Sequence, residues 1–143
     1  MVHLSIEFLE ADVEVEQTQL YYSEAVSPDP SCCNACATFL LAVQRDQIPA
    51  EVRTFCKQAG IDISKPVEAW GAPDGGFLQM WWPFAGLQAG GVDPSKKVQF
   101  SGGFTCCITN SFPGAQPQEL AVELTWESAT LTALEGEAWP IGA

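Results

Sequence analysis

The sequence predicts an α+β domain, a mostly antiparallel sheet with two helices packed on one face. Three observations lead to this fold class. Apolar and polar residues alternate near both ends of the chain, which is typical of half-buried strands. Residues 31–60 instead carry apolar residues at helical spacing. After residue 66, short strand patterns recur between glycine-rich turns, so strands dominate the second half.

The first residues predict a β-hairpin. A period of two fits a strand with one buried face, and the apolar members of the pattern are Val2, Leu4, Ile6 and Phe8. Residues 10–12 are the expected turn. The second strand is expected to start at Val13 and to continue through Leu20 to Tyr22.

Two helices are expected in the centre of the chain. Ser31 is placed to cap a helix that runs to about Gln44, with an inner stripe of Cys33, Cys36, Phe39, Leu40 and Val43. Pro49 begins the second helix and Gly60 suits its C-terminal cap. The inner residues of the second helix are Val52, Phe55 and Cys56.

Five further strands are expected, at residues 67–70, 77–84, 98–100, 104–108 and 119–126. Residues 73–76, Pro-Asp-Gly-Gly, form the hairpin turn between the first two of them. The last strand has the clearest pattern. Its apolar face is Leu120, Val122, Leu124 and Trp126, and its polar face is Glu119, Glu123, Thr125 and Glu127.

The length and composition indicate one globular domain over residues 1–143, with a loosely ordered tail from about residue 135. The chain has 143 residues, of which 47% are hydrophobic, enough for one sizeable core. Its start lacks a basic segment followed by an apolar run, and no stretch approaches the roughly 20 apolar residues of a membrane span. A cytoplasmic location is therefore expected.

The charge is strongly acidic and unevenly distributed. Eighteen acids against six bases give a net charge of −12, and the first base is Arg45 and the last is Lys97. Such a surface repels phosphate backbones and anionic membranes, so neither nucleic acid nor a membrane is expected as a partner. A basic protein would be attracted. The alternative is that the acidity only maintains solubility.

Residue types for catalysis are scarce. His3 is the single histidine, which disfavours Ser-His and Cys-His hydrolysis. Glycine-rich nucleotide motifs and the His-Glu-x-x-His metalloprotease motif are absent from the sequence. A carboxylate pair contributed by distant strands stays open as an alternative. The sequence therefore favours a protein that is not an enzyme.

The cysteines allow three interpretations. Zinc or iron would use Cys33, Cys36, Cys56 and one of Cys106 and Cys107 as ligands. Redox chemistry would use Cys32 or Cys33, whose pKa a helix start would lower. Core packing is favoured, because free cysteine is a commonly buried residue type. Cys36 and Cys56 are then expected to be buried, and Cys106 and Cys107 to point to opposite faces of a strand, one inward and one outward.

Two adjacent tryptophans lie in one predicted strand. Because neighbouring strand residues face opposite sides, one of Trp81 and Trp82 is expected to pack under the helices. The other is a candidate for contact with a partner.

Several short motifs are spread over most of the chain. They are Cys33, Cys36 and Phe39; Gly-Ile-Asp at 60–62; Lys-Pro-Val-Glu at 65–68; Asp74-Gly75; Trp81, Phe84 and Gly86; and the acidic strand 119–126. Together they resemble an uncharacterised family of small bacterial proteins with a CxNC-x-x-F and GID-x-x-KP-x-E pattern. Ala35 departs from that pattern, and Cys32, Cys106 and Cys107 are additions to it. The resemblance implies one α+β domain and no mechanism.

These observations favour a non-enzymatic, acidic protein-binding domain of the inhibitor or immunity type, which would neutralise a basic partner without a cofactor. The expected partner-binding residues are Glu14, Glu16, Trp81, Glu123 and Glu127. The alternative function is binding of zinc or iron by cysteine thiolates.

Overall fold

A computed structural model describes residues 1–29, 31, 34–72 and 77–127. Its elements, in chain order, are β1 Val2–Ile6, β2 Leu9–Val13, α1 Val15–Glu24, α2 Asn34–Gln44, α3 Ala50–Ala59, β3 Glu68–Ala72, β4 Phe77–Leu87, β5 Val98–Phe100, β6 Phe104–Thr109 and β7 Glu119–Trp126. The strands form one seven-stranded sheet whose described pairs are all antiparallel. The predicted α+β class and antiparallel sheet are confirmed, although the described chain has three helices where two were predicted.

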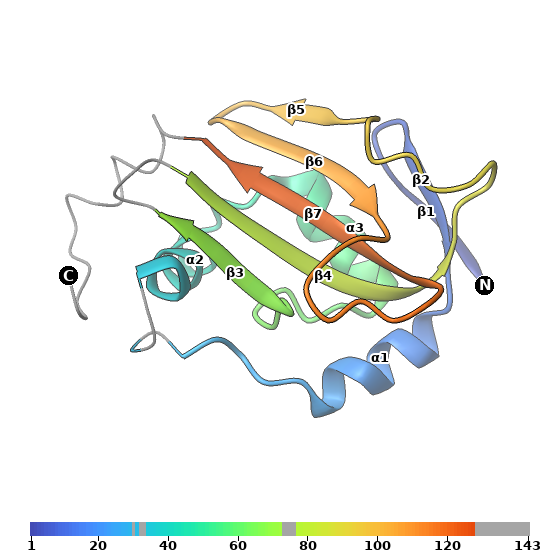
Figure 1. The fold of residues 1–143 in the computed structure, drawn as a ribbon, viewed down its shortest axis with the longest axis horizontal. Helices are drawn as coiled ribbons and strands as arrows, with labels where there is room; N and C mark the ends of the chain where they lie inside the picture. Colours follow the sequence, from blue (N-terminus) through green and yellow to red (C-terminus); the bar gives the residue numbers. More distant parts are fainter. Residues whose placement is uncertain (30, 32–33, 73–76, 128–143) are drawn as a thin grey trace.

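The long strand β4 organises the sheet (Figure 1). The strand order is β1-β2-β4-β7-β6-β5, and β3 also pairs with β4. One edge of β4 pairs with β7 over eight residues, from Leu78 opposite Trp126 to Ala85 opposite Glu119. The other edge pairs with β3 at the start of β4 and with β2 at its end. Strand β4 therefore connects the N-terminal hairpin to the rest of the sheet.

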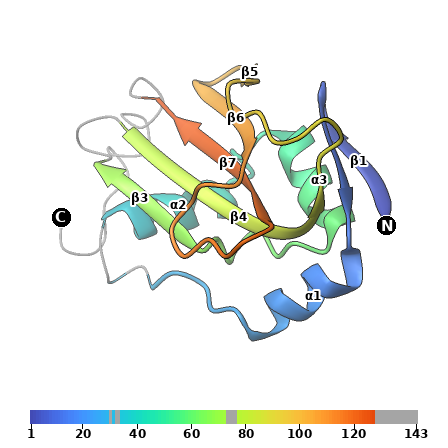
Figure 2. The ribbon, with the colours of Figure 1, turned by 45° about the vertical axis from the view of Figure 1, so that its right-hand side comes forward.

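The main core lies between the sheet and helices α2 and α3, which Figures 1 and 2 show behind the strands. Phe39 of α2 lies against Trp82, with ring centroids 6.0 Å apart. Phe55 of α3 lies edge-on to Phe84 at 5.6 Å. We call the face of the sheet that carries Trp82 and Phe84 the inner face, and the opposite one the outer face. On β7, the predicted apolar side is the inner one, since its four apolar residues belong to the buried core.

The N-terminal hairpin turns earlier than predicted. Ile6 pairs with Leu9, so Glu7 and Phe8 form the turn, and Glu7 adopts a positive φ of 54°. Residues 10–12, predicted as the turn, belong to strand β2. Phe8, predicted on the apolar side of the first strand, is instead exposed at the turn, and Leu9 restarts the buried alternation.

The predicted strand from Val13 to Tyr22 is wrong beyond Val13, because residues 15–24 form helix α1. Thr18 and Tyr22 are its buried residues, and their spacing of four is the spacing of one helix face. Each of these two hydroxyls also forms a hydrogen bond with a distant backbone atom of β4, so local sequence patterns give little indication of this helix. Among the described helices, none is long and apolar enough to cross a membrane.

Helix α3 ends where predicted. Gly60 has a φ of 83°, and the amide of Ile61 donates to the carbonyl oxygen of Cys56 at 2.9 Å. A Cβ atom at Gly60 would also approach the side chain of Gln19 in α1 to 2.6 Å. Glycine therefore both closes α3 and allows α1 to approach it.

Candidate functional site

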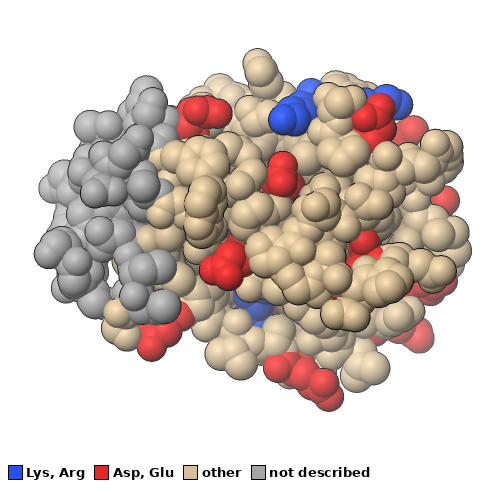
Figure 3. Space-filling view, in the orientation of Figure 1, with Lys and Arg blue, Asp and Glu red and all other residues tan. Residues whose placement is uncertain are grey.

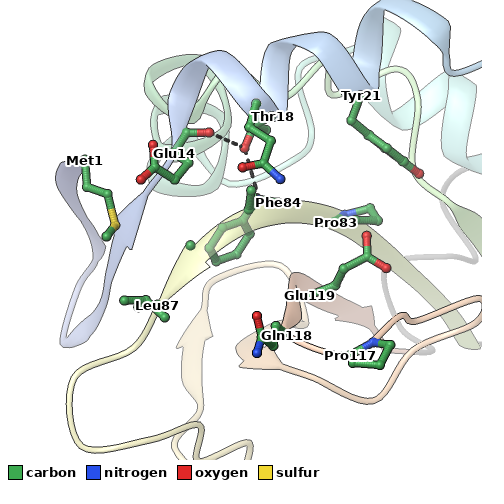
Figure 4. Close-up of a pocket in the computed structure, with 13 residues that line it drawn as sticks. Met1, Glu14, Thr18, Tyr21, Pro83, Phe84, Leu87, Pro117, Gln118 and Glu119 are labelled. Atoms are coloured by element: carbon green, nitrogen blue, oxygen red, sulfur yellow. Dashed lines mark hydrogen bonds between the residues drawn. The ribbon is translucent and has the colours of Figure 1, made fainter.

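A pocket of about 440 Å³ lies between α1, β4 and the segment before β7. Figure 4 shows α1 on one side of the pocket and β4 with residues 117–119 on the other. The lining residues are Met1, Glu14, Gln17, Thr18, Tyr21, Pro83, Phe84, Ala85, Gly86, Leu87, Pro117, Gln118 and Glu119. We call this cavity the α1–β4 pocket.

Two side chains of α1 hold the helix over β4 and so create the pocket. The hydroxyl of Tyr22 donates a 2.7 Å hydrogen bond to the carbonyl oxygen of Pro83. The hydroxyl of Thr18 donates to the carbonyl oxygen of Glu14 at 2.9 Å and accepts the amide hydrogen of Ala85 at 3.1 Å. Proline at 83 leaves its carbonyl oxygen free to accept, and it has no amide hydrogen to satisfy.

Carboxylates lie on both sides of the pocket, at Glu14 and Glu119. Within the part of the chain that the structure describes, no hydrogen bond or ion pair involves the carboxylate of Glu14. One oxygen of Glu119 accepts the amide hydrogen of Gln116 at 2.7 Å, which leaves its second oxygen for another donor. Burial, with the negative charge of Glu119, raises the pKa of the Tyr21 hydroxyl. The pocket therefore favours a cation.

The rest of the lining is apolar or amide, and neither lysine nor arginine contributes to it. Pro83 and Phe84 are buried, while Leu87 is exposed at the edge. The hydroxyl of Thr18 also lines the pocket, but it already forms two hydrogen bonds that hold α1 on β4 and is therefore not available to a ligand. The combination suits binding of a cation on an apolar stem.

The predicted partner-binding residues do not form one surface. Glu14 lines the pocket, and Glu16 is exposed on the first turn of α1. Glu127 is exposed just beyond β7. Trp81 and Glu123 lie on the outer face of the sheet, opposite each other in β4 and β7. Figure 3 shows acidic atoms dispersed over the outer face, with lysine and arginine confined to a few spots.

On the outer face, Glu123 connects Trp81 to Cys107. One carboxylate oxygen accepts the indole hydrogen of Trp81 at 2.8 Å, and the other accepts the thiol hydrogen of Cys107 at 3.2 Å. Burial and the adjacent carboxylate raise the pKa of Cys107 to about 12, although Lys97 opposes the shift. The thiol therefore stays protonated at neutral pH, which makes it a poor nucleophile.

The tryptophans only partly match the prediction. Trp82 packs under the helices as predicted, but Trp81 on the outer face is also buried, with 8% of its surface exposed. Among the described tryptophans, the exposed one is Trp70 of β3, at 58%, whose ring lies edge-on to Phe77. Trp70 alternates with the buried Ala69, but the sequence gives no indication of which side is exposed, because both side chains are apolar.

The described cysteines, Cys36, Cys56, Cys106 and Cys107, are all buried. Burial of Cys36 and Cys56 was predicted and is confirmed. Cys106 belongs to the main core whereas Cys107 contacts Glu123 on the outer face, so the opposite orientations are confirmed. The outer face nevertheless covers Cys107, which is only 2% exposed.

The predicted metal ligands are not brought together as far as the structure describes them. Cys33 lies outside the described residues, as does Cys32. Elsewhere in the described chain, no three histidine, cysteine or acidic side chains converge in a way that could hold an ion. Cys36, Cys56 and Cys106 therefore do not form a metal centre by themselves.

His3 forms a cross-strand cluster with two acids of β2. Its ring nitrogens lie 2.9 Å from Asp12 and 3.2 Å from Glu10. The hydrogen bond to Asp12, followed by the one to Glu10, raises the pKa of His3 above its ordinary value of 6.5. Because the folded state binds the proton more tightly, the cluster stabilises the fold below about pH 6.5, and this contribution disappears as the pH rises through the folded pKa.

We expect an NMR titration of His3, the single histidine, to give a pKa above 6.5. The variant Asp12→Asn should lower that pKa, because it removes the strongest partner of the imidazolium ion. The variant Glu16→Gln removes an equal charge on α1 and should leave the pKa nearly unchanged. A wild-type pKa at or below 6.5 would contradict the cross-strand cluster.

The fold and the cavity together define an α+β domain with an acid-lined pocket at one end of its sheet. No family model, curated protein sequence or solved structure matches the chain. The resemblance to the CxNC-x-x-F family therefore stays a prediction.

Proposed function

We propose that the chain is a cytoplasmic, non-enzymatic binding domain that captures a basic protein partner, in the manner of an inhibitor or immunity protein. The observation that carries the proposal is the α1–β4 pocket. It combines carboxylates at Glu14 and Glu119 with an apolar floor and no lysine or arginine. A cationic side chain of a partner would be attracted there and could bury its stem.

The surroundings of the pocket support the same proposal. The first base in the chain is Arg45, so the N-terminal hairpin and α1 contain no lysine or arginine. Their acids are Glu7, Glu10, Asp12, Glu14, Glu16 and Glu24. Charge of one sign accelerates association with an oppositely charged partner and selects against acidic ones. Glu14 and Glu16, predicted from the sequence as contact residues, belong to this region.

The experiment is recovery of the partner from the source cell, followed by affinity measurements with both purified proteins. We expect a basic protein whose affinity falls at least tenfold between about 50 mM and about 500 mM salt, because the salt ions screen the attraction between opposite charges. Glu14→Gln should weaken binding, whereas Lys57→Gln on α3 should not. Recovery of no partner, or an affinity independent of salt, would refute the proposal.

A further inference from the structure

Resting on the function proposed above, the geometry points to an arginine side chain of the partner as the group that enters the α1–β4 pocket. The pocket volume of about 440 Å³ falls within the range of roughly 300–1,000 Å³ that is typical of small-ligand sites. A single long side chain inserted from a partner is therefore a suitable occupant in size.

The apolar residues of the pocket suit the aliphatic stem of a long cationic side chain. Its apolar lining includes the buried Pro83 and Phe84, and the exposed side chain of Leu87 lies at the edge (Figure 4). Leu87 is 58% exposed and therefore has apolar surface available to a partner. Methylene groups of a cationic side chain would cover this surface while the charged end remains among polar atoms.

The acceptors are distributed rather than gathered at one point. Glu14 comes from the start of α1, and Glu119 comes from the start of β7. Gln17 and Gln118 add amide oxygens from the same two sides. A guanidinium has five donors in a planar fork, whereas an ammonium is a compact charge with three donors, so separated acceptors favour arginine over lysine.

The aromatic lining also favours arginine. Tyr21 lines the pocket and is 40% exposed, so part of its ring is accessible. Guanidinium groups stack on aromatic rings more readily than ammonium groups do, because they are planar and more weakly hydrated. Tyr21 would then serve as a stacking surface on the α1 side of the pocket.

The test is an NMR titration of the full chain with N-acetyl-arginine-methylamide. We expect the resonances of Tyr21 and Leu87 to shift in a saturable manner. N-acetyl-citrulline-methylamide has nearly the same shape without the charge and should bind at least fivefold more weakly. The affinity of N-acetyl-lysine-methylamide should lie between those of the arginine and citrulline analogues.

The matched variants are Glu119→Gln and Glu24→Gln. Glutamine at 119 keeps an oxygen for the amide of Gln116, so the segment before β7 should retain its conformation while losing the charge. Affinity for the arginine analogue should fall roughly two- to fivefold. Glu24→Gln removes the same charge from the far end of α1 and should leave the affinity unchanged.

Equal binding of the citrulline analogue, or an equal loss of affinity in both variants, would overturn the inference. The proposed function is tested separately. Salt-dependent binding of a basic protein would still be observed if that partner used another acidic surface and left the pocket empty. If the arginine analogue does not bind in the pocket and no basic partner binds in a salt-dependent manner, both proposals are refuted. Resonance shifts confined to Tyr21, Leu87 and their neighbours would show that the analogue occupies the pocket. Attraction by the net charge would instead spread small shifts over the acidic surface.

Discussion

Replacing Trp82 with alanine is expected to lower the free energy of unfolding by about 3–5 kcal/mol. Trp82 is fully buried on the inner face of β4 and contacts Phe39 of α2. Its indole also donates a 2.9 Å hydrogen bond to the carbonyl oxygen of Ile63. The substitution would leave a large cavity and a buried acceptor without its donor. Urea denaturation followed by circular dichroism measures the change.

The control for this prediction is Trp70→Ala, which removes the same side chain from an exposed site. Its cost should stay below about 1 kcal/mol, because Trp70 buries less surface. Trp82→Phe separates the two contributions. It keeps an aromatic ring but loses the donor to Ile63, and should cost about 1–3 kcal/mol. Equal costs for Trp70→Ala and Trp82→Ala would contradict the assigned core.

The second large effect is a loss of stability in alkaline solution. Burial raises the pKa of Cys56, Cys106 and Cys107 above the ordinary value of 9.0, and raises that of Tyr22 above 10.0. The folded state therefore holds these protons more tightly than the unfolded state. The stabilisation is complete below about pH 9 and is lost progressively above it, by about 1 kcal/mol per pH unit for each thiol.

Three buried thiols together should lose several kcal/mol between pH 9 and pH 11, a large part of the stability of a domain of this size. Denaturation curves at stepped pH, in the presence of a reductant, measure this loss. Between pH 9 and pH 10, where the three thiols dominate and Tyr22 contributes little, Cys106→Ala should reduce the slope of stability against pH by about one third, even if it lowers stability at pH 7. An unchanged slope would show that Cys106 ionises equally in both states.

Much of the architecture could be predicted from local patterns. Helix α3 carries Val52, Phe55 and Cys56 at helical spacing and ends at the predicted Gly60. Strand β7 alternates as predicted, because one of its faces is the main core. In both cases a regular apolar pattern coincides with one buried face, which is the condition under which sequence periodicity is informative.

Helix α1 and the pocket could not be predicted in this way. The helix has few buried residues, and Thr18 and Tyr22 are held by β4, more than sixty residues later in the chain. Because the local pattern predicts a strand from Val13 to Tyr22, the sequence gives no reason to place Tyr21 near Glu119. Of the pocket residues, Glu14 is the one that the sequence predicts as a partner contact, from the excess of negative charge.

The sequence by itself determined the α+β class, the antiparallel strands, the ends of α3 and the acidic, base-free N-terminal region, because these depend on local periodicity and composition. Only the tertiary structure decided which side chains meet. It paired Glu123 with Trp81 and Cys107 across three strands, and it closed the pocket by holding α1 on β4. Such contacts join residues far apart in the chain, and local patterns carry no information about them.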